Sequence, residues 1–183
     1  THGRYMIFPG KGLHKLSQAE IINSGQALRD DLEKMAYASY VTELLDALTP
    51  EEDPTTRIFP LLAGTLSLGN SGRFPLAVRA YEIRLMSELG YKPELYHCLN
   101  CRDELKTNLF FTPEGGAVCA QCTSHYRDTV KLTNGTWELM KRLLEWDLSR
   151  ITILHPSKGD IKELRNLMRN YIDFRLEYPL KSL

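Results

Sequence analysis

The chain has 183 residues, of which 43% are hydrophobic and 25% are charged, and its 23 basic residues are balanced by 23 acidic ones. This composition is that of an ordinary globular chain of one domain or two small ones, and the zero net charge argues against a protein that binds nucleic acid with its whole surface. No apolar run approaches the roughly 20 residues of a membrane span and no signal peptide opens the chain, so we expect no membrane association and a cytoplasmic location.

The first 25 residues have the character of a β-hairpin. Residues 4–8 are β-prone, the run 9–12 (Pro-Gly-Lys-Gly) is a strong turn signal, and residues 13–16 can return as a second strand. The next residues are ambiguous, because 17–20 (Ser-Gln-Ala-Glu) fits a helix capping box whereas 19–24 can also form a strand.

Three helices are expected between residues 26 and 89. Apolar residues recur at three- and four-residue steps from Leu28 to Leu48, which predicts a first helix beginning near Gln26. A second helix is predicted from about Pro54 to Leu68, and Pro60 within it should cause a kink or mark a late start. A third is predicted over 75–89, since proline suits the first turn and Gly90 a helix end; its apolar set is Leu76, Ala80, Ile83, Leu85, Met86 and Leu89.

All four cysteines of the chain lie between residues 98 and 122. Cys98 and Cys101 form one CxxC pair, 17 residues separate it from the next, and Cys119 and Cys122 form the second. Each pair places two sulfurs on one tight turn, and two such turns offer four soft ligands for tetrahedral Zn²⁺. Two disulfides would need an oxidising compartment, and a thioredoxin-type redox pair would not need a second copy.

The segment between the two pairs predicts a small hairpin of a zinc ribbon or knuckle. Residues 109–112 are strand-like, 113–116 (Pro-Glu-Gly-Gly) form a turn, and 117–118 lead back to the second pair. Four thiolates leave no open coordination position, so we expect structural rather than catalytic zinc. His97 and His125 flank the cysteines, but with four thiols present we do not assign either as a ligand.

Two more helices are predicted after the cysteines, one starting at Thr133 or Thr136 and one from a capping-box-like Ser157 to about Tyr178. The inner face of the first should hold Trp137, Met140, Leu143, Leu144 and Leu148. The second carries a stripe of four basic residues, spaced four, three and four apart: Lys158, Lys162, Arg165 and Arg169. The stripe can neutralise phosphates of DNA, although a solvated helix face is the commoner meaning of such a pattern.

Other candidates are weaker. Arg73, Arg79 and Arg84 could form a second basic surface, and here too a solvated face is the commoner meaning. Six aromatic residues have helical core spacing, and we interpret them as core rather than as platforms for stacked bases: Tyr37, Tyr40, Phe59, Trp137, Trp146 and Tyr171. The chain has no phosphate-binding loop, no GxSxG or HExxH motif and no H-x-E element of a zinc deaminase, so we expect no enzyme.

Several motifs in order resemble the bacterial RecO recombination-mediator family. They are Gly12-Leu13 followed by 16–20 (Leu-Ser-Gln-Ala-Glu), 29–33 (Arg-Asp-Asp-Leu-Glu) running into 35–40 (Met-Ala-Tyr-Ala-Ser-Tyr), and 90–95 (Gly-Tyr-Lys-Pro-Glu-Leu) before the first CxxC. Gly115-Gly116 before Cys119, 146–150 (Trp-Asp-Leu-Ser-Arg) and 180–182 (Leu-Lys-Ser) continue the match over essentially the whole chain.

The resemblance implies a mainly α fold, in which a helical domain over 26–183 carries a four-cysteine zinc ribbon or knuckle inserted at 98–122. Residues 1–25 would be a remnant of an N-terminal OB-fold, and a chain that starts at Thr1 rather than Met would lack most of that fold. The resemblance implies zinc bound by the four cysteines, although some members lack them. It also implies a non-enzymatic, nucleoid-associated DNA-repair mediator that anneals strands.

The implied partners are single- and double-stranded DNA, RecR and the C-terminal tail of the single-stranded DNA-binding protein. With them the family helps to load recombinase on DNA coated by that protein. The residues leave one main alternative open, a zinc-containing scaffold that binds proteins and not DNA. A zinc-ribbon transcription factor is disfavoured by the amount of helix around so small a ribbon.

Overall fold

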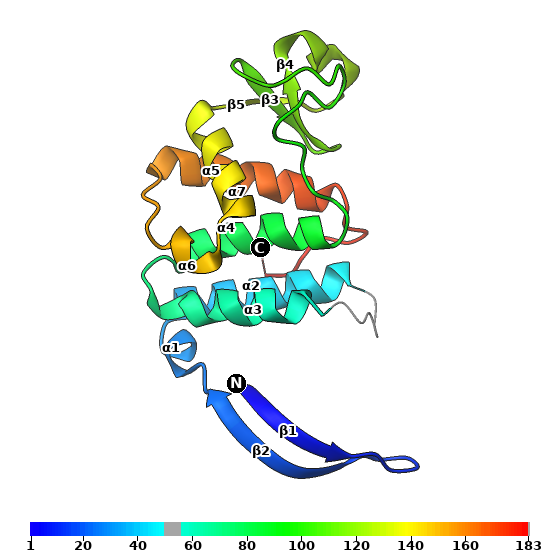
Figure 1. Ribbon diagram of the computed structural model, residues 1–183, viewed down its shortest axis with the longest axis vertical. Coiled ribbons are helices and arrows are strands. Elements are labelled where there is room, and N and C mark those ends of the chain that lie inside the picture. Colours follow the sequence, from blue (N-terminus) through cyan, green and yellow to red (C-terminus); the bar gives the residue numbers. More distant parts are fainter. Residues whose placement is uncertain (50–55, 183) are drawn as a thin grey trace.

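Helix α4 (Phe74–Glu88) is the centre of the molecule, and helices α2, α3, α5, α6 and α7 pack around it (Figure 1). The computed structural model describes residues 1–49 and 56–182. Pro75 lies in the first turn of α4, where its missing N–H costs nothing, and Gly90 follows the helix with a φ of 86°. The fold is mainly α with two small sheets, as the sequence predicted.

The burial of α4 is more complete than its sequence pattern indicated. The predicted apolar set is buried except for Leu89, which is partly buried. Ala77, Val78 and Tyr81 are fully buried as well, and so is the charged residue Glu82. A helix buried on every side shows little amphipathic periodicity, and α4 therefore forms the core of the helical body.

The predicted first helix is divided into α1 (Gln26–Arg29) and α2 (Leu32–Leu48). The break falls at Asp30 and Asp31, and the Asp31 side chain accepts a hydrogen bond from Lys34 N, which caps α2. The periodic series from Leu28 to Leu48 marks the buried face only in part. Tyr40 and Leu44 of that series are buried, whereas Leu32 is 78% exposed.

Helix α3 (Ile58–Ser67) places Pro60 in its first turn, so the proline marks a late start and no kink is needed. The start predicted at Pro54 lies outside the described residues. The helix continues into a short 3-10 helix, η1 (Leu68–Asn70), and the chain turns at Gly72, which has a φ of 66°.

The C-terminal helices are α5 (Asn134–Glu145), α6 (Leu148–Ile151) and α7 (Lys158–Asp173). Thr133 caps α5 through Thr136 N, and the capping box at Ser157 is confirmed because Ser157 and Asp160 bond reciprocally. Two of the predicted helices were longer than the observed ones. Leu148 belongs to α6 rather than to the preceding helix, and α7 ends at Asp173 rather than near Tyr178.

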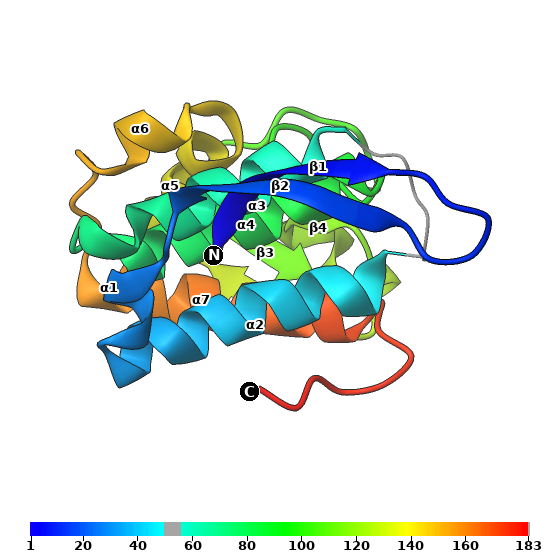
Figure 2. The same cartoon turned by 90° about the horizontal axis from the view of Figure 1, so that it is seen from below.

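The N-terminal residues form an antiparallel hairpin of β1 (His2–Phe8) and β2 (Lys15–Asn23). The capping box at 17–20 is therefore wrong, and the strand alternative is correct. The hairpin lies at one end of the molecule, and seen from that side its tip extends past the helices (Figures 1 and 2). Its large apolar side chains are exposed on both faces, among them Tyr5, Ile7 and Phe8.

The second sheet lies at the opposite end and has the strand order β4-β3-β5 (Figure 1). Its strands are β3 (Leu109–Thr112), β4 (Gly116–Cys119) and β5 (Val130–Leu132), and β3 pairs antiparallel with both neighbours. The hairpin β3–β4 was predicted, but β5 was not. A Cβ at Gly116, which has a φ of 139°, would lie 2.4 Å from Glu94 O, so only glycine fits this turn.

The small sheet and the helices share one hydrophobic core. Phe111 of β3 packs against Tyr171 of α7, with ring centroids 5.5 Å apart. Trp137 Nε1 donates to Leu95 O at 2.7 Å. The segment that carries the cysteines is therefore fixed to the body by side chains of α5 and α7. Among the described residues no helix has the length and apolar character needed to cross a membrane.

Candidate metal centre and nucleic-acid interface

The first CxxC pair lies on a tight knuckle before β3. Cys98 N donates to Asp103 O at 2.8 Å, and Arg102 N donates to Cys98 O at 3.0 Å, which closes the chain around the pair. Arg102 adopts a left-handed conformation with a φ of 66°. This turn directs the two sulfurs of the pair to the same side.

The second pair begins at the last residue of β4. Cys119 ends the strand, and Cys122 follows on the 3-10 helix η2 (Ala120–His125). Because β4 pairs with β3 next to the first knuckle, the sheet brings the two pairs together. Cys119 N donates to Cys98 Sγ at 3.4 Å, a bond between the two knuckles.

The four sulfurs converge on a common centre, as the spacing predicted. All lie within 4.8 Å of one another, and Cys101 Sγ is 3.9 Å from Cys119 Sγ. Four thiolates at about 2.3 Å from one Zn²⁺ form a tetrahedron with edges of about 3.8 Å, so the cluster has the right size. It can hold a metal ion, and neither His97 nor His125 belongs to it.

The protein favours the thiolate form at one of the four sulfurs, that of Cys98, whereas the pKa values of the Cys101 and Cys119 thiols are raised by burial and by the neighbouring cysteines. Burial alone would raise the pKa of the Cys98 thiol, but backbone N–H groups of Cys119, Cys101 and Asn100 outweigh it and lower that pKa to about 6. A thiol must lose its proton to bind a metal, so these donors favour the ligating form. Cys98 and Cys122 are buried, whereas Cys101 is exposed.

One supporting side chain was missed by the sequence analysis. Asn100 Nδ2 donates to Cys122 Sγ at 3.4 Å and so bridges the knuckles from outside the thiol set. Such donors orient a ligand and tune its charge. The signal available in the sequence was its position inside a CxxC loop, where a short amide can reach a sulfur.

The four residues of the basic stripe, Lys158, Lys162, Arg165 and Arg169, are all exposed on α7. The two acidic residues in the first turns of α7, Asp160 and Glu163, are engaged by other groups. Asp160 completes the capping box, and Glu163 accepts hydrogen bonds from Thr133 and Thr136 at the start of α5. Arg169 alone of the four has an ion-pair partner among the described residues, Asp173 at 3.7 Å. The stripe is thus positively charged along its length.

Comparison with known proteins gives a consistent result. The family description "Recombination protein O C terminal" matches residues 29–183. A DNA repair protein RecO of Pelotomaculum thermopropionicum is 38% identical over the whole chain, which covers 72% of that relative. A second, from Symbiobacterium thermophilum, is 39% identical, with the whole chain covering 74% of it. The chain belongs to the RecO family.

Within this RecO-family fold, two of the three arginines of the second basic candidate, Arg79 and Arg84, are engaged inside the protein. Arg79 is buried and its Nη2 lies 2.9 Å from Glu82 Oε1, so its charge is used inside the core. Arg84 is half-buried and donates to the carbonyl oxygens of Leu143 and Trp146. Neither guanidinium is available to a phosphate, which leaves the α7 stripe as the better candidate.

The aromatic residues divide into core and surface. Tyr40, Trp137 and Tyr171 are buried, which confirms their assignment to the core. Tyr37 and Trp146 are partly buried and pack against this core, whereas Phe59 is 60% exposed. For Phe59 the assignment to the core is wrong, because this side of α3 faces the β1–β2 hairpin rather than another helix.

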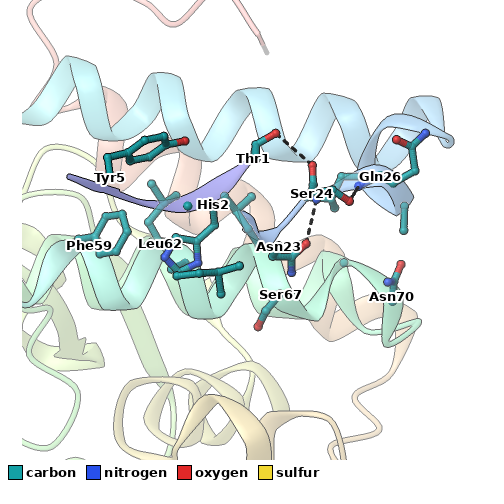
Figure 3. A pocket seen from close by; sticks show the side chains of 18 residues that line it. Thr1, His2, Tyr5, Asn23, Ser24, Gln26, Phe59, Leu62, Ser67 and Asn70 are labelled. Atoms are coloured by element: carbon teal, nitrogen blue, oxygen red, sulfur yellow. Dashed lines mark hydrogen bonds between the residues drawn. The ribbon is translucent and has the colours of Figure 1, made fainter. Parts of the chain in front are cut away.

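The space between the hairpin and α3 is a groove with a volume of about 780 Å³ (Figure 3). His2 and Tyr5 of β1 line one side, and Phe59 and Leu62 of α3 line the other. His2 packs edge-on against Phe59, with ring centroids 5.4 Å apart. The groove is mainly apolar, and no local sequence pattern predicts it, because residues 1–5 and 22–28 form it together with residues 59–70.

Proposed function

We propose that this chain is a non-catalytic DNA-binding mediator of DNA repair and homologous recombination, which binds single- and double-stranded DNA and anneals complementary strands. The observation that carries this proposal is the similarity, over the whole of this chain, to proteins named DNA repair protein RecO. The exposed stripe on α7 supports it physically, because exposed Lys and Arg side chains bind phosphates and release counterions.

The four cysteines are proposed as ligands of one structural Zn²⁺. The size of the sulfur cluster and the lowered pKa of Cys98 support this assignment. When bound, the metal would hold the two knuckles together. A complete set of four thiolates leaves no site for a substrate or water, so zinc would supply stability rather than chemistry.

Residues 1–25 are proposed as the last strands of an OB-fold, and 26–183 as the helical domain with its metal-binding insertion. The exposed apolar side chains on both faces of β1 and β2 support this, because an isolated two-stranded hairpin is marginally stable in water. An OB barrel that included this hairpin would supply a second DNA-binding surface.

The family resemblance extends the proposal to partners. These are RecR and the C-terminal tail of the single-stranded DNA-binding protein, with loading of recombinase as the joint outcome. The site of action would be the bacterial nucleoid, in the cytoplasm. Reduced thiols, which the proposed zinc site needs, are consistent with that compartment.

Charge reversal on α7 tests the proposal. The variant K162E/R165E/R169E should weaken binding to single-stranded and duplex oligonucleotides and lower the slope of log affinity against log salt concentration by about 2–3, since three phosphate contacts are lost. The matched control R57E/K106E/R127E changes net charge equally at exposed positions outside α7. It should retain most of the affinity and of the slope.

Strand annealing gives the second measurement. The wild type should accelerate annealing of two labelled complementary oligonucleotides, and the α7 variant should not. If the α7 variant binds and anneals DNA like the wild type but loses binding to RecR or to the C-terminal tail of the single-stranded DNA-binding protein, α7 is a protein-binding surface and the scaffold alternative is favoured.

A further inference from the structure

Trp146 is partly buried and packs against the hydrophobic core, and two arginine side chains lie near its indole ring. The Cζ of Arg150 lies 4.8 Å from the ring centroid, and that of Arg142 lies 5.7 Å from it. The two arginines stand four residues on either side of Trp146 in the sequence, and both are exposed. The exposed part of an aromatic ring and two cations thus lie close together at the surface.

The backbone of Trp146 is held firmly at the end of α5. Trp146 N donates to Arg142 O at 2.9 Å and closes the last turn of the helix. The half-buried Arg84 donates to the carbonyl oxygens of Leu143 and Trp146 from α4. The ring therefore stands on a rigid support, so little conformational freedom is lost when a ligand covers it.

The charge of the two arginines is not cancelled. Among the residues that the structure describes, neither guanidinium has a carboxylate within ion-pair distance. The acidic neighbour Glu145 is directed elsewhere, since it accepts a hydrogen bond from the Tyr96 hydroxyl.

The other tryptophan on α5 shows the contrast. Lys141 Nζ lies 3.7 Å from the centroid of the Trp137 ring, but Glu138 pairs with that ammonium at 2.6 Å. Trp137 itself is buried and donates to Leu95 O. The ammonium of this second cluster is paired with a carboxylate, whereas the two guanidinium groups at Trp146 have no carboxylate partner among the described residues.

We propose that Trp146, Arg142 and Arg150 form a stacking platform for an unpaired base of single-stranded DNA, with the two guanidinium groups against the flanking phosphates. The proposal rests on the DNA binding proposed above and names a site for it outside α7. Every base has a π-face, so such a platform tolerates any sequence. The bases of a duplex are already stacked on each other, so the platform prefers single strands.

The exchange of contacts on the ring favours the base. An exposed contact between a cation and an aromatic ring is worth only about a two- to fivefold change in an equilibrium constant. Stacking of one base on such a ring raises the affinity for the nucleic acid by about five- to 100-fold. A base can therefore displace one guanidinium from the indole, and the displaced side chain remains close enough to contact a phosphate.

The test compares wild type, W146L, W146F and R142Q/R150Q in binding to a labelled 20-nucleotide oligo-dT and to a duplex of equal length. We expect W146L to weaken binding to the single strand by about five- to 100-fold and binding to the duplex by less than twofold. W146F, which keeps an aromatic ring, should lose less than W146L. Y178L is the matched control, because it removes an aromatic side chain that is 78% exposed outside this cluster.

Two further readouts keep the test decisive if W146L folds poorly. Saturating oligo-dT should quench the tryptophan fluorescence of the wild type but not of W146F, since Trp137 is buried. R142Q/R150Q, which changes only exposed side chains, should lower the salt slope for the single strand by about one to two.

The outcomes separate the two proposals. If W146L and W146F both bind the single strand as tightly as the wild type does, and oligo-dT quenches the wild type and W146F alike, the platform is wrong while the DNA-binding function stands. If the wild type binds neither form of DNA, both proposals fail together.

Discussion

The hydroxyl of Tyr40 donates a 2.6 Å hydrogen bond to Glu82 Oε1 and joins α2 to α4 inside the core. Arg79 Nη2 reaches the same oxygen at 2.9 Å, so one buried carboxylate oxygen accepts from two helices. The second oxygen, Oε2, has no hydrogen-bond partner among the described residues. A buried charge with incomplete pairing is costly, and this cluster should therefore control the stability of the helical body.

Removing the Tyr40 hydroxyl should destabilise the protein. In Tyr40→Phe the carboxylate loses a buried donor, and we expect the free energy of unfolding to fall by about 1–3 kcal/mol, measured by urea denaturation at pH 7.5. Tyr37→Phe is the control, because Tyr37 is half-buried on the same helix and its hydroxyl has no hydrogen-bond partner among the described residues. Equal stability of Y40F and Y37F would mean that the Tyr40 bond contributes nothing net.

Glu82 should also make stability depend on pH in an unusual direction. Burial raises the pKa of its carboxyl to about 7, against the opposing effects of Arg79 and Tyr40. The folded state then binds more protons than the unfolded state between pH 4.5 and 7. The free energy of unfolding should fall as pH rises through this window, by on the order of 3 kcal/mol from this group, and level off above pH 7.

The comparison that isolates this effect is Glu82→Gln, measured from pH 4.5 to 8 in parallel with the wild type. The variant leaves Arg79 without its partner and should be less stable at pH 8. The gap between the two stability curves must change across pH 4.5–7. Parallel curves over that interval would show that Glu82 does not titrate there.

The sequence predicts features that depend on local spacing. The two CxxC pairs, the capping box of Ser157 and the turn at Gly116 each depend on a few adjacent residues, and each was found where expected. Features that depend on contacts between distant segments were missed. Glu82 sits three residues from Arg79 like any helical ion pair, and nothing local shows that both are buried.

Helix ends were the least predictable part of the fold for the same reason. Apolar periodicity runs through Asp30 and Asp31 without interruption, although the Asp31 side chain caps a new helix there. It also continues past Asp173, whereas α7 stops and Arg175 turns to the insertion, with its Nη1 2.8 Å from Pro113 O. The groove between the hairpin and α3 has no local signature at all.

Metal binding should depend on the cysteines and not on the neighbouring histidines. We expect one Zn²⁺ per chain by elemental analysis, and loss of most of it in Cys98→Ser or Cys119→Ser. The melting temperature should fall by about 10 °C, because structural zinc contributes several kcal/mol and each costs about 2–4 °C in a chain of this size. His97→Ala and His125→Ala should retain the metal. Full zinc content in both serine variants would refute the four-thiolate site.

Arg175 should couple the metal-binding insertion to the helical body. Its guanidinium lies 3.7 Å from the centroid of the Tyr171 ring and donates to Pro113 O at 2.8 Å and to Tyr171 O at 2.6 Å. Pro113 lies in the turn between β3 and β4. The Arg175 side chain, just past the end of α7, therefore links this small sheet to the helical body. Only a planar guanidinium can stack on the ring and donate to two carbonyl groups at once.

We therefore expect Arg175→Ala to lower the free energy of unfolding by about 2–3 kcal/mol and Arg175→Lys by about half as much. Amide hydrogen exchange should accelerate in β3 and β4 while α4 stays protected, because the lost contacts reach the insertion rather than the core helix. Arg169→Ala is the matched control, since its exposed pair with Asp173 contributes less than about 0.5 kcal/mol. If R175A exchanges uniformly faster in α4 and the sheet, Arg175 stabilises the whole fold and does not act as a local link.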